Sequence, residues 1–206
     1  MREGTWLRPS KITSTIDDTI TIQTEPKTDL WQRTYYGFRV ANAPMFLWRD
    51  SSNFAFSFKC RFPYSVLYDQ CGVVLYLDDE NWFKASIEYE NSDFSRLGSV
   101  VTNHGQSDWA TTDITTPGEL WYRLSRRGPD FLVESSKDGN RYQQMRVFHM
   151  YHLGETTAKM GSRQPSEIPC GEIQFGVYAC SPTGGSFLAE FSNFHFGPSQ
   201  WQAETP

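Results

Sequence analysis

Hydrophobic and polar residues alternate along much of this chain, in short segments separated by turn residues. Residues 54–62 are the clearest case, because every even position holds phenylalanine or cysteine and the odd positions hold Ala, Ser, Lys and Arg. Successive side chains of a β-strand point to opposite faces, so this period of two predicts a strand with one face in a core. Further strands are expected at residues 19–24, 71–77, 97–103, 120–126, 131–135, 172–179 and 186–196.

The remaining segments complete the picture of an all-β chain. Residues 71–77 are apolar at odd and even positions alike, which predicts a central strand covered on both faces. The dipeptide Asp138-Gly139 predicts a hairpin turn. Residues 143–153 fit a helix and a strand equally well, and the polar residues 154–169 are expected to form a long surface loop. The whole pattern is typical of a sandwich or barrel. We expect one domain over residues 1–206, with its core at about residues 6–197 and a flexible tail at 198–206.

Charge and composition exclude several classes of protein. The net charge is −5 at pH 7, whereas nucleic-acid binding requires clustered Lys and Arg, so no nucleic-acid partner is expected. No segment has the apolar length of a membrane-spanning helix, and residues 1–13 lack the apolar region of a secretion signal. We therefore expect a cytoplasmic protein without a membrane partner. No glycine-rich phosphate loop is present, and no cofactor is predicted.

Cysteine and histidine spacing gives no sign of a metal site. Four cysteines follow neither a CxxC pattern nor zinc spacing, and we expect free buried thiols, with a bond between Cys60 and Cys71 as the alternative. His149 and His152 would lie on opposite faces of a strand, without a third ligand nearby. The acidic turns at residues 17–18 and 78–80 are interpreted as solvated turns rather than calcium sites.

The most informative stretch is residues 67–90, which predicts two adjacent strands joined by an acidic turn at 78–81. In the second strand the odd positions are mostly apolar and belong in a core. The even positions form a polar row that contains an indole: Trp82, Lys84, Ser86, Glu88 and Glu90. If the register allows, Gln70 of the first strand reaches the same face. A polar sheet face with a tryptophan is typical of a sugar-binding surface.

This row predicts a site for a polyol, because hydroxyl groups need both donors and acceptors and an indole stacks on the apolar face of a sugar. The expected ligand contacts come from the row itself and from other strands or loops: Gln70, Trp82, Lys84, Glu88, His104, Trp109 and Arg123. His104 could equally be a turn residue. The alternative for Lys84 and Glu88 is an ordinary surface pair. The hypothesis requires that the even side chains open into a shared hollow.

Two glutamates also allow a catalytic interpretation. Glu88 and Glu90 lie on one face, roughly 6.5–7 Å apart along the strand, which permits the carboxylate pair of a retaining glycosidase. The pair Glu88 and Asp108 is a second possibility for an enzyme. Solvated surface carboxylates are the alternative to both.

Several short motifs are spread over residues 19–197: 28–31 (TDLW), 36–38 (YGF), 68–72 (YDQCG), 79–88 (DENWFKASIE), 100–102 (VVT), 107–109 (SDW), 121–123 (WYR) and 135–139 (SSKDG). In combination they resemble the DUF1349 family. This resemblance implies a concanavalin A-like lectin/glucanase fold, a jelly-roll β-sandwich of two antiparallel sheets. It implies no established activity, and it is compatible with a role beside a metabolic enzyme.

Three functional hypotheses follow. The first is a cytoplasmic carbohydrate-binding or carbohydrate-sensing protein that holds a small saccharide or sugar derivative on the polar, concave face of one sheet. The second is a glycoside-processing enzyme that uses Glu88 with a second carboxylate. The third is a regulatory partner of a metabolic enzyme, which would bind through residues 154–169 or an exposed sheet.

Overall fold

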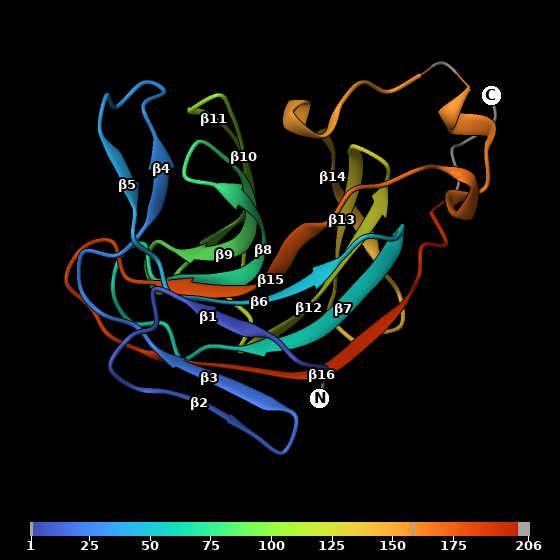
Figure 1. Ribbon diagram of the computed structural model, residues 1–206. Coiled ribbons are helices and arrows are strands. Elements are labelled where there is room, and N and C mark those ends of the chain that lie inside the picture. The colour runs from blue at the N-terminus through green and yellow to red at the C-terminus, as the bar shows by residue number, and fades with distance from the viewer. Residues whose placement is uncertain (1, 158, 202–206) are drawn as a thin grey trace.

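Two seven-stranded antiparallel sheets lie face to face in the computed structural model, which describes residues 2–157 and 159–201 (Figure 1). The first sheet has the order β1 (Thr5–Leu7), β6 (Met45–Asp50), β15 (Ile173–Cys180), β8 (Gln70–Asp78), β9 (Asn81–Tyr89), β10 (Ser95–Asn103) and β11 (Gln106–Ile114). The second has the order β14 (Gln143–His149), β13 (Asp130–Ser136), β12 (Glu119–Arg127), β7 (Phe54–Arg61), β16 (Leu188–Pro198), β3 (Thr19–Gln23) and β2 (Thr13–Ile16). The predicted antiparallel β-sandwich is confirmed.

The period of two determines which side chains form the core between the sheets. In β7 the even positions Phe54, Phe56 and Phe58 are buried, and in β9 the odd positions Phe83 and Ile87 are buried, as the alternation predicts. Both sets point into the space between the two sheets and belong to one apolar cluster. The even positions of β9 therefore point away from this core, to the outer face of the first sheet.

Part of that outer face is covered by a small hairpin, β4 (Leu30–Gln32) and β5 (Arg39–Ala41). A second apolar cluster lies between the hairpin and the sheet; it contains Leu30, Val74 and Trp82. Because Val73 and Leu75 belong to the core and Val74 to this second cluster, β8 is covered on both faces at the centre of its sheet, as predicted. Figure 1 shows β4 and β5 standing beside β10 and β11.

The ambiguous residues 143–153 divide into strand β14 and the 3-10 turn η1 (Tyr151–Leu153). The expected loop 154–169 contains two further 3-10 turns, η2 (Met160–Ser162) and η3 (Pro165–Glu167). The expected tail begins inside β16, and the Ser199 amide donates to the carbonyl of Asn53 at 3.1 Å. Residues 198–201 are thus tied to the sandwich, and 202–206 lie outside the described residues.

All four cysteines are free thiols, as expected, although the Sγ atoms of Cys60 and Cys71 lie 3.1 Å apart across the two sheets. Over residues 2–157 and 159–201, no group of three or more His, Cys, Asp or Glu side chains could hold a metal ion. The same part of the chain contains no helix with the length and apolar character needed to cross a membrane.

Candidate functional site

A cavity of about 330 Å³ lies on the outer face of the first sheet, over β8, β9 and β10. Its lining combines charged and amide side chains on the sheet with aromatic side chains around them. The lining residues are Asp29, Trp31, Tyr36, Phe38, Tyr68, Gln70, Lys84, Ser86, Glu88, Arg96, Gly98, Ser99, Val100, Trp109, Pro182 and Thr183. Three of the five side chains in the polar row, Lys84, Ser86 and Glu88, therefore share one hollow, whereas Trp82 and Glu90 do not line it.

The register of the strands arranges the floor of this cavity in rows. Glu88 of β9 lies between Gln70 of β8 and Arg96 of β10. Four residues earlier, Lys84 lies between Val74 and Val100. Since a strand rises about 3.3 Å per residue, the Cα atoms of Lys84 and Glu88 are roughly 13 Å apart, and the floor carries one charged group near each end.

Lys84 is buried and paired with Asp29, the residue directly before β4. The Lys84 Nζ lies 2.9 Å from Asp29 Oδ1, and the two side chains are only 5% and 18% exposed. Burial alone would lower the pKa of Lys84, but the attraction of Asp29 outweighs it and holds this pKa above its usual value. Lys84 is therefore a fixed cation whose charge is already balanced by the protein.

Glu88 occupies the other end of the floor and has a neutral partner. Gln70 Nε2 donates to Glu88 Oε2 at 3.0 Å, and the Tyr178 hydroxyl donates to Gln70 Oε1 at 3.1 Å. Burial raises the pKa of Glu88 to about 7, with repulsion from Asp29 and Glu90 adding to the rise and Lys84 and Arg96 opposing it. Near neutral pH this carboxyl group can therefore donate or accept a proton.

The raised pKa makes stability depend on pH in a defined direction. Between the ordinary value of 4.5 and about 7, the folded chain holds a proton at Glu88 that the unfolded chain has lost. The free energy of unfolding therefore falls as pH rises through this interval, by up to about 3 kcal/mol from this group. Glu88→Gln removes the contribution, so urea denaturation should show the variant gaining stability relative to wild type between about pH 5 and pH 8. A stability difference between Glu88→Gln and wild type that stays constant with pH would contradict the raised pKa of Glu88.

Five aromatic side chains form the walls of the cavity: Trp31, Tyr36, Phe38, Tyr68 and Trp109. Trp109 of β11 is 38% exposed, and its ring centre lies 6.4 Å from that of Trp31. A Cβ atom at position 98 would lie 3.3 Å from Trp109 Nε1 and 2.9 Å from a methyl group of Thr111. Glycine at this position therefore lets the indole lie close over the floor.

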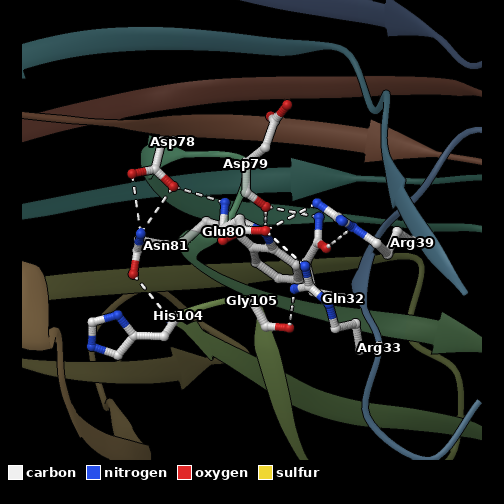
Figure 2. Close-up of polar contacts among 10 residues, drawn as sticks. Gln32, Arg33, Arg39, Asp78, Asp79, Glu80, Asn81, His104 and Gly105 are labelled. Carbon is white, nitrogen blue, oxygen red and sulfur yellow. Dashed lines mark hydrogen bonds and ion pairs between the residues drawn. The ribbon is translucent and has the colours of Figure 1, made fainter. Parts of the chain in front are cut away.

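Polar contacts attach the hairpin to the turn between β8 and β9, so the aromatic wall has a fixed base (Figure 2). Arg33 and Arg39 both donate to Glu80 Oε1, each at 2.9 Å. Gln32 Nε2 donates to the carbonyl of Asp79 at 2.8 Å, and Arg33 also donates to the carbonyl of Gly105. The acidic turn at 78–80 thus holds side chains of the protein itself, as Figure 2 shows.

Three of the residues expected to bind a ligand lie outside the cavity. Trp82 is fully buried in the cluster beneath the hairpin, with its Nε1 directed to the carbonyl of Asp79. Arg123 lies on β12 of the other sheet, where Glu134 accepts two of its hydrogen bonds at 2.6 and 2.7 Å. His104 occupies the turn between β10 and β11. Gln70, Lys84, Glu88 and Trp109 are the expected residues that line the cavity.

The two expected partners of Glu88 in an enzyme also lie outside the cavity lining. Glu90 follows β9 and pairs with Arg96 Nη1 at 3.0 Å. Asp108 is exposed and pairs with Arg146 of β14 at 2.7 Å. The second carboxylate that lines the cavity is Asp29.

Sequence reasoning did not select Asp29, Tyr68 or Arg96 as site residues. Asp29 and Tyr68 lie within motifs 28–31 and 68–72, which was the available signal. Arg96 lies directly opposite Glu88 in the β9–β10 pairing, so the register of that hairpin would have indicated it.

A second hollow, of about 680 Å³, lies beside Asn53 and η3. The Asn53 amide is fully engaged there: Nδ2 donates to the carbonyls of Pro165 and Ile168, and Oδ1 accepts from the Gly128 amide and the Cys170 thiol. The Asn53 amide in the second hollow therefore already bonds to other parts of the chain, and the first cavity is the stronger candidate for a ligand.

Known proteins resemble this chain in sequence and in fold. The chain is 30% identical over 196 residues to "Regulation of enolase protein 1" of Saccharomyces cerevisiae, which covers 94% of this chain and 89% of that protein. The crystal structure of a functionally unknown protein from Saccharomyces cerevisiae superposes with a TM-score of 0.80 and 26% identity, covering 96% and 97% of the two chains. A xylan β-1,4-xylosidase from Bacillus halodurans shares only the fold, with a TM-score of 0.64 and 12% identity over 87% of this chain and 32% of that one.

A family model described as "Protein of unknown function (DUF1349)" matches residues 6–199, nearly the whole chain. The motifs quoted from the sequence lie within this match, and the sandwich of two antiparallel sheets is the fold that the resemblance implied. The chain therefore belongs to the DUF1349 family.

Proposed function

We propose that this protein is a cytoplasmic carbohydrate-binding or carbohydrate-sensing protein whose ligand, a small saccharide or sugar derivative, occupies the cavity over β8, β9 and β10. The observation that carries the proposal is the combination of a polar floor with aromatic walls in one hollow of about 330 Å³. A volume of this size lies within the range of small-molecule sites.

The chemistry of the floor matches a polyhydroxylated ligand. Lys84 and Arg96 donate hydrogen bonds, Glu88 accepts them or donates one when protonated, and Gln70 and Ser86 can do both. The Trp109 ring offers a flat apolar surface for the C–H face of a sugar. Hydroxyl groups at several positions of one ring can therefore be satisfied together.

A panel of mono- and oligosaccharides, tested by thermal shift and then by calorimetry, checks this function. At least one saccharide should raise the melting temperature, and the stabilisation should grow with its free concentration L as RT ln(1 + L/Kd). Glu88→Ala and Trp109→Ala should each weaken its binding about tenfold or more, because the first removes a buried hydrogen-bonding group and the second the stacking surface.

Tyr151→Ala is the matched control, since this side chain is 64% exposed on η1 and does not line the cavity. It should bind the saccharide as wild type does. Failure of the whole panel to bind wild type, or equal binding by Glu88→Ala, would contradict the proposal.

A second candidate, a glycoside-processing enzyme, is favoured by one observation. The pKa of Glu88 is raised to about 7, which suits a general acid near neutral pH. Asp29 is the other carboxylate of the cavity lining, but it is paired with Lys84 at 2.9 Å, so this activity would depend on Glu88. Chromogenic glycosides should then be hydrolysed by wild type and not by Glu88→Gln, whereas turnover that survives this substitution would exclude Glu88 as the acid.

A regulatory role beside a metabolic enzyme is supported by the name of the yeast relative. The tip of the hairpin offers exposed aromatic surface for such a contact, since Tyr35, Tyr36 and Phe38 are 94%, 54% and 50% exposed. A pull-down with purified enolase, compared between wild type and Tyr35→Ala, separates this role from saccharide binding alone. Retention of enolase by wild type and not by the variant would support a contact at the tip of the hairpin.

A further inference from the structure

Among the charged residues that line the cavity, Asp29, Lys84 and Arg96 each form an ion pair, whereas Glu88 is hydrogen-bonded to a neutral side chain. Lys84 Nζ lies 2.9 Å from Asp29, and Arg96 Nη1 lies 3.0 Å from Glu90. Within the part of the chain that the structure describes, no cationic side chain forms an ion pair with Glu88, whose hydrogen-bond partner is the neutral amide of Gln70. When Glu88 ionises, the cavity therefore holds one negative charge without a direct counter-charge.

The walls of the cavity are suited to a cation. Aromatic rings attract positive charge through their faces, and groups of such rings are a recurring binding site for ammonium ions. Tyr36, Phe38, Tyr68 and Trp109 surround the floor. The protein already uses one of these rings in this way, because the Arg96 guanidinium lies 5.7 Å from the ring centre of Trp109.

We propose that the ligand of this cavity carries a positively charged nitrogen, the protonated amine of an amino sugar, and that this amine pairs with Glu88 among the aromatic rings. The inference rests on the proposed saccharide function and narrows its substrate class. The hydroxyl groups of the sugar would use the remaining donors and acceptors of the floor, toward Ser86 and Lys84.

Proton linkage gives an independent consequence. The charged and titratable groups that act on Glu88 are Lys84 and Glu90 in its own segment, Asp29 beside β4, Arg96 on β10, Tyr68 before β8 and Cys180 on β15. Burial raises the pKa of Glu88 to about 7. A bound cation favours the ionised carboxylate and lowers this pKa, so binding near pH 7 should release protons. A neutral sugar should release fewer.

The test measures affinities by calorimetry at about pH 8, where Glu88 is ionised, and each affinity of an amino sugar is calculated for the fraction of the ligand whose amine is protonated. The probes are sugars with an amine at C2 or at C6, their neutral parents, and tetramethylammonium, which has the charge but no hydroxyl groups. At least one amino sugar should bind about tenfold or more tightly than its parent, and Glu88→Gln should remove this preference. Glu172→Gln should keep it, since Glu172 is exposed and pairs with Arg49 instead.

The outcomes separate this inference from the function on which it rests. Equal affinity of wild type for amino and neutral sugars overturns the inference and leaves saccharide binding intact. Saturable binding of tetramethylammonium that Glu88→Gln abolishes, without binding of any sugar, supports the cation site and overturns the saccharide function. No binding of any probe overturns both.

A measurement on wild type keeps the test independent of how well the variant folds. Calorimetry in buffers of different ionisation enthalpy gives the net number of protons exchanged on binding, and subtracting the protons that the amine of the sugar takes up gives the number released by the protein. Release near pH 7 that disappears at about pH 9 supports Glu88 as the amine partner, because the carboxyl group has no proton left to lose there. Uptake of protons, or no change, overturns it.

Discussion

Replacing Asp29 by asparagine is expected to lower the free energy of unfolding by about 3 kcal/mol, because the buried Lys84 ammonium loses its counter-charge. Lys84 Nζ lies 2.9 Å from Asp29, with its side chain only 5% exposed. Asparagine keeps the shape of the residue and an oxygen that can accept from the Leu30 amide, as Asp29 Oδ1 does. The loss therefore reports the charge itself. Urea denaturation of the ligand-free protein measures it.

A double-mutant cycle with Lys84→Met completes this prediction. The double variant should be more stable than Asp29→Asn alone, because no uncompensated charge remains buried. Breaking the exposed pair between Arg49 and Glu172, with side chains 59% and 58% exposed, is the control and should cost less than about 1 kcal/mol. Equal stability of Asp29→Asn and wild type would mean that Lys84 does not depend on this partner.

Replacing Phe56 by alanine is expected to cost about 3–5 kcal/mol, the range for truncation of a fully buried phenylalanine. Its ring is fully buried and lies 5.1–5.3 Å, centre to centre, from four neighbouring rings: Trp48, Phe58, Phe175 and Phe196. These neighbours come from both sheets, so the cavity left by the deletion would lie at the centre of the sandwich. Denaturant unfolding should show the loss with the two-state slope unchanged.

Tyr35→Ala serves as the comparison for this truncation. Its ring is 94% exposed at the tip of the hairpin, and its removal should change stability by less than about 0.5 kcal/mol. Similar losses in the two variants would show that the centre of the sandwich relaxes around the deletion.

Strands could be predicted from the sequence where apolar and polar residues alternate along them. Residues 54–61 and 81–89 form strands, and the alternation in the sequence indicated which of their side chains face the core between the sheets. Strand β11 gave no such signal, because it is a largely exposed edge strand without an apolar face. Strand β6 begins with four consecutive buried residues, Met45 to Trp48, a run without alternation that is shorter than the apolar run at residues 71–77.

The site was only partly predictable, because long-range placement decides it. The polar row of Lys84, Ser86 and Glu88 follows from parity within one strand. The ion pair with Asp29 joins residues 55 positions apart, and no local pattern indicates it. Arg123 alternates on its strand as a site residue would, but that strand belongs to the other sheet. Alternation shows which side chains share one face of a strand, but it does not show which of the two sheets contains that strand.

One strand, β9, supplies the sandwich core with its odd residues and the cavity floor with its even residues. A single residue inserted within residues 82–88 would exchange these two sets beyond the insertion, turning charged side chains inward and Phe83 or Ile87 outward. Length changes between members of the family should therefore be confined to the turns on either side of this strand, near residues 78–81 and 90–94. An alignment gap inside the strand would mark a member whose cavity has been lost.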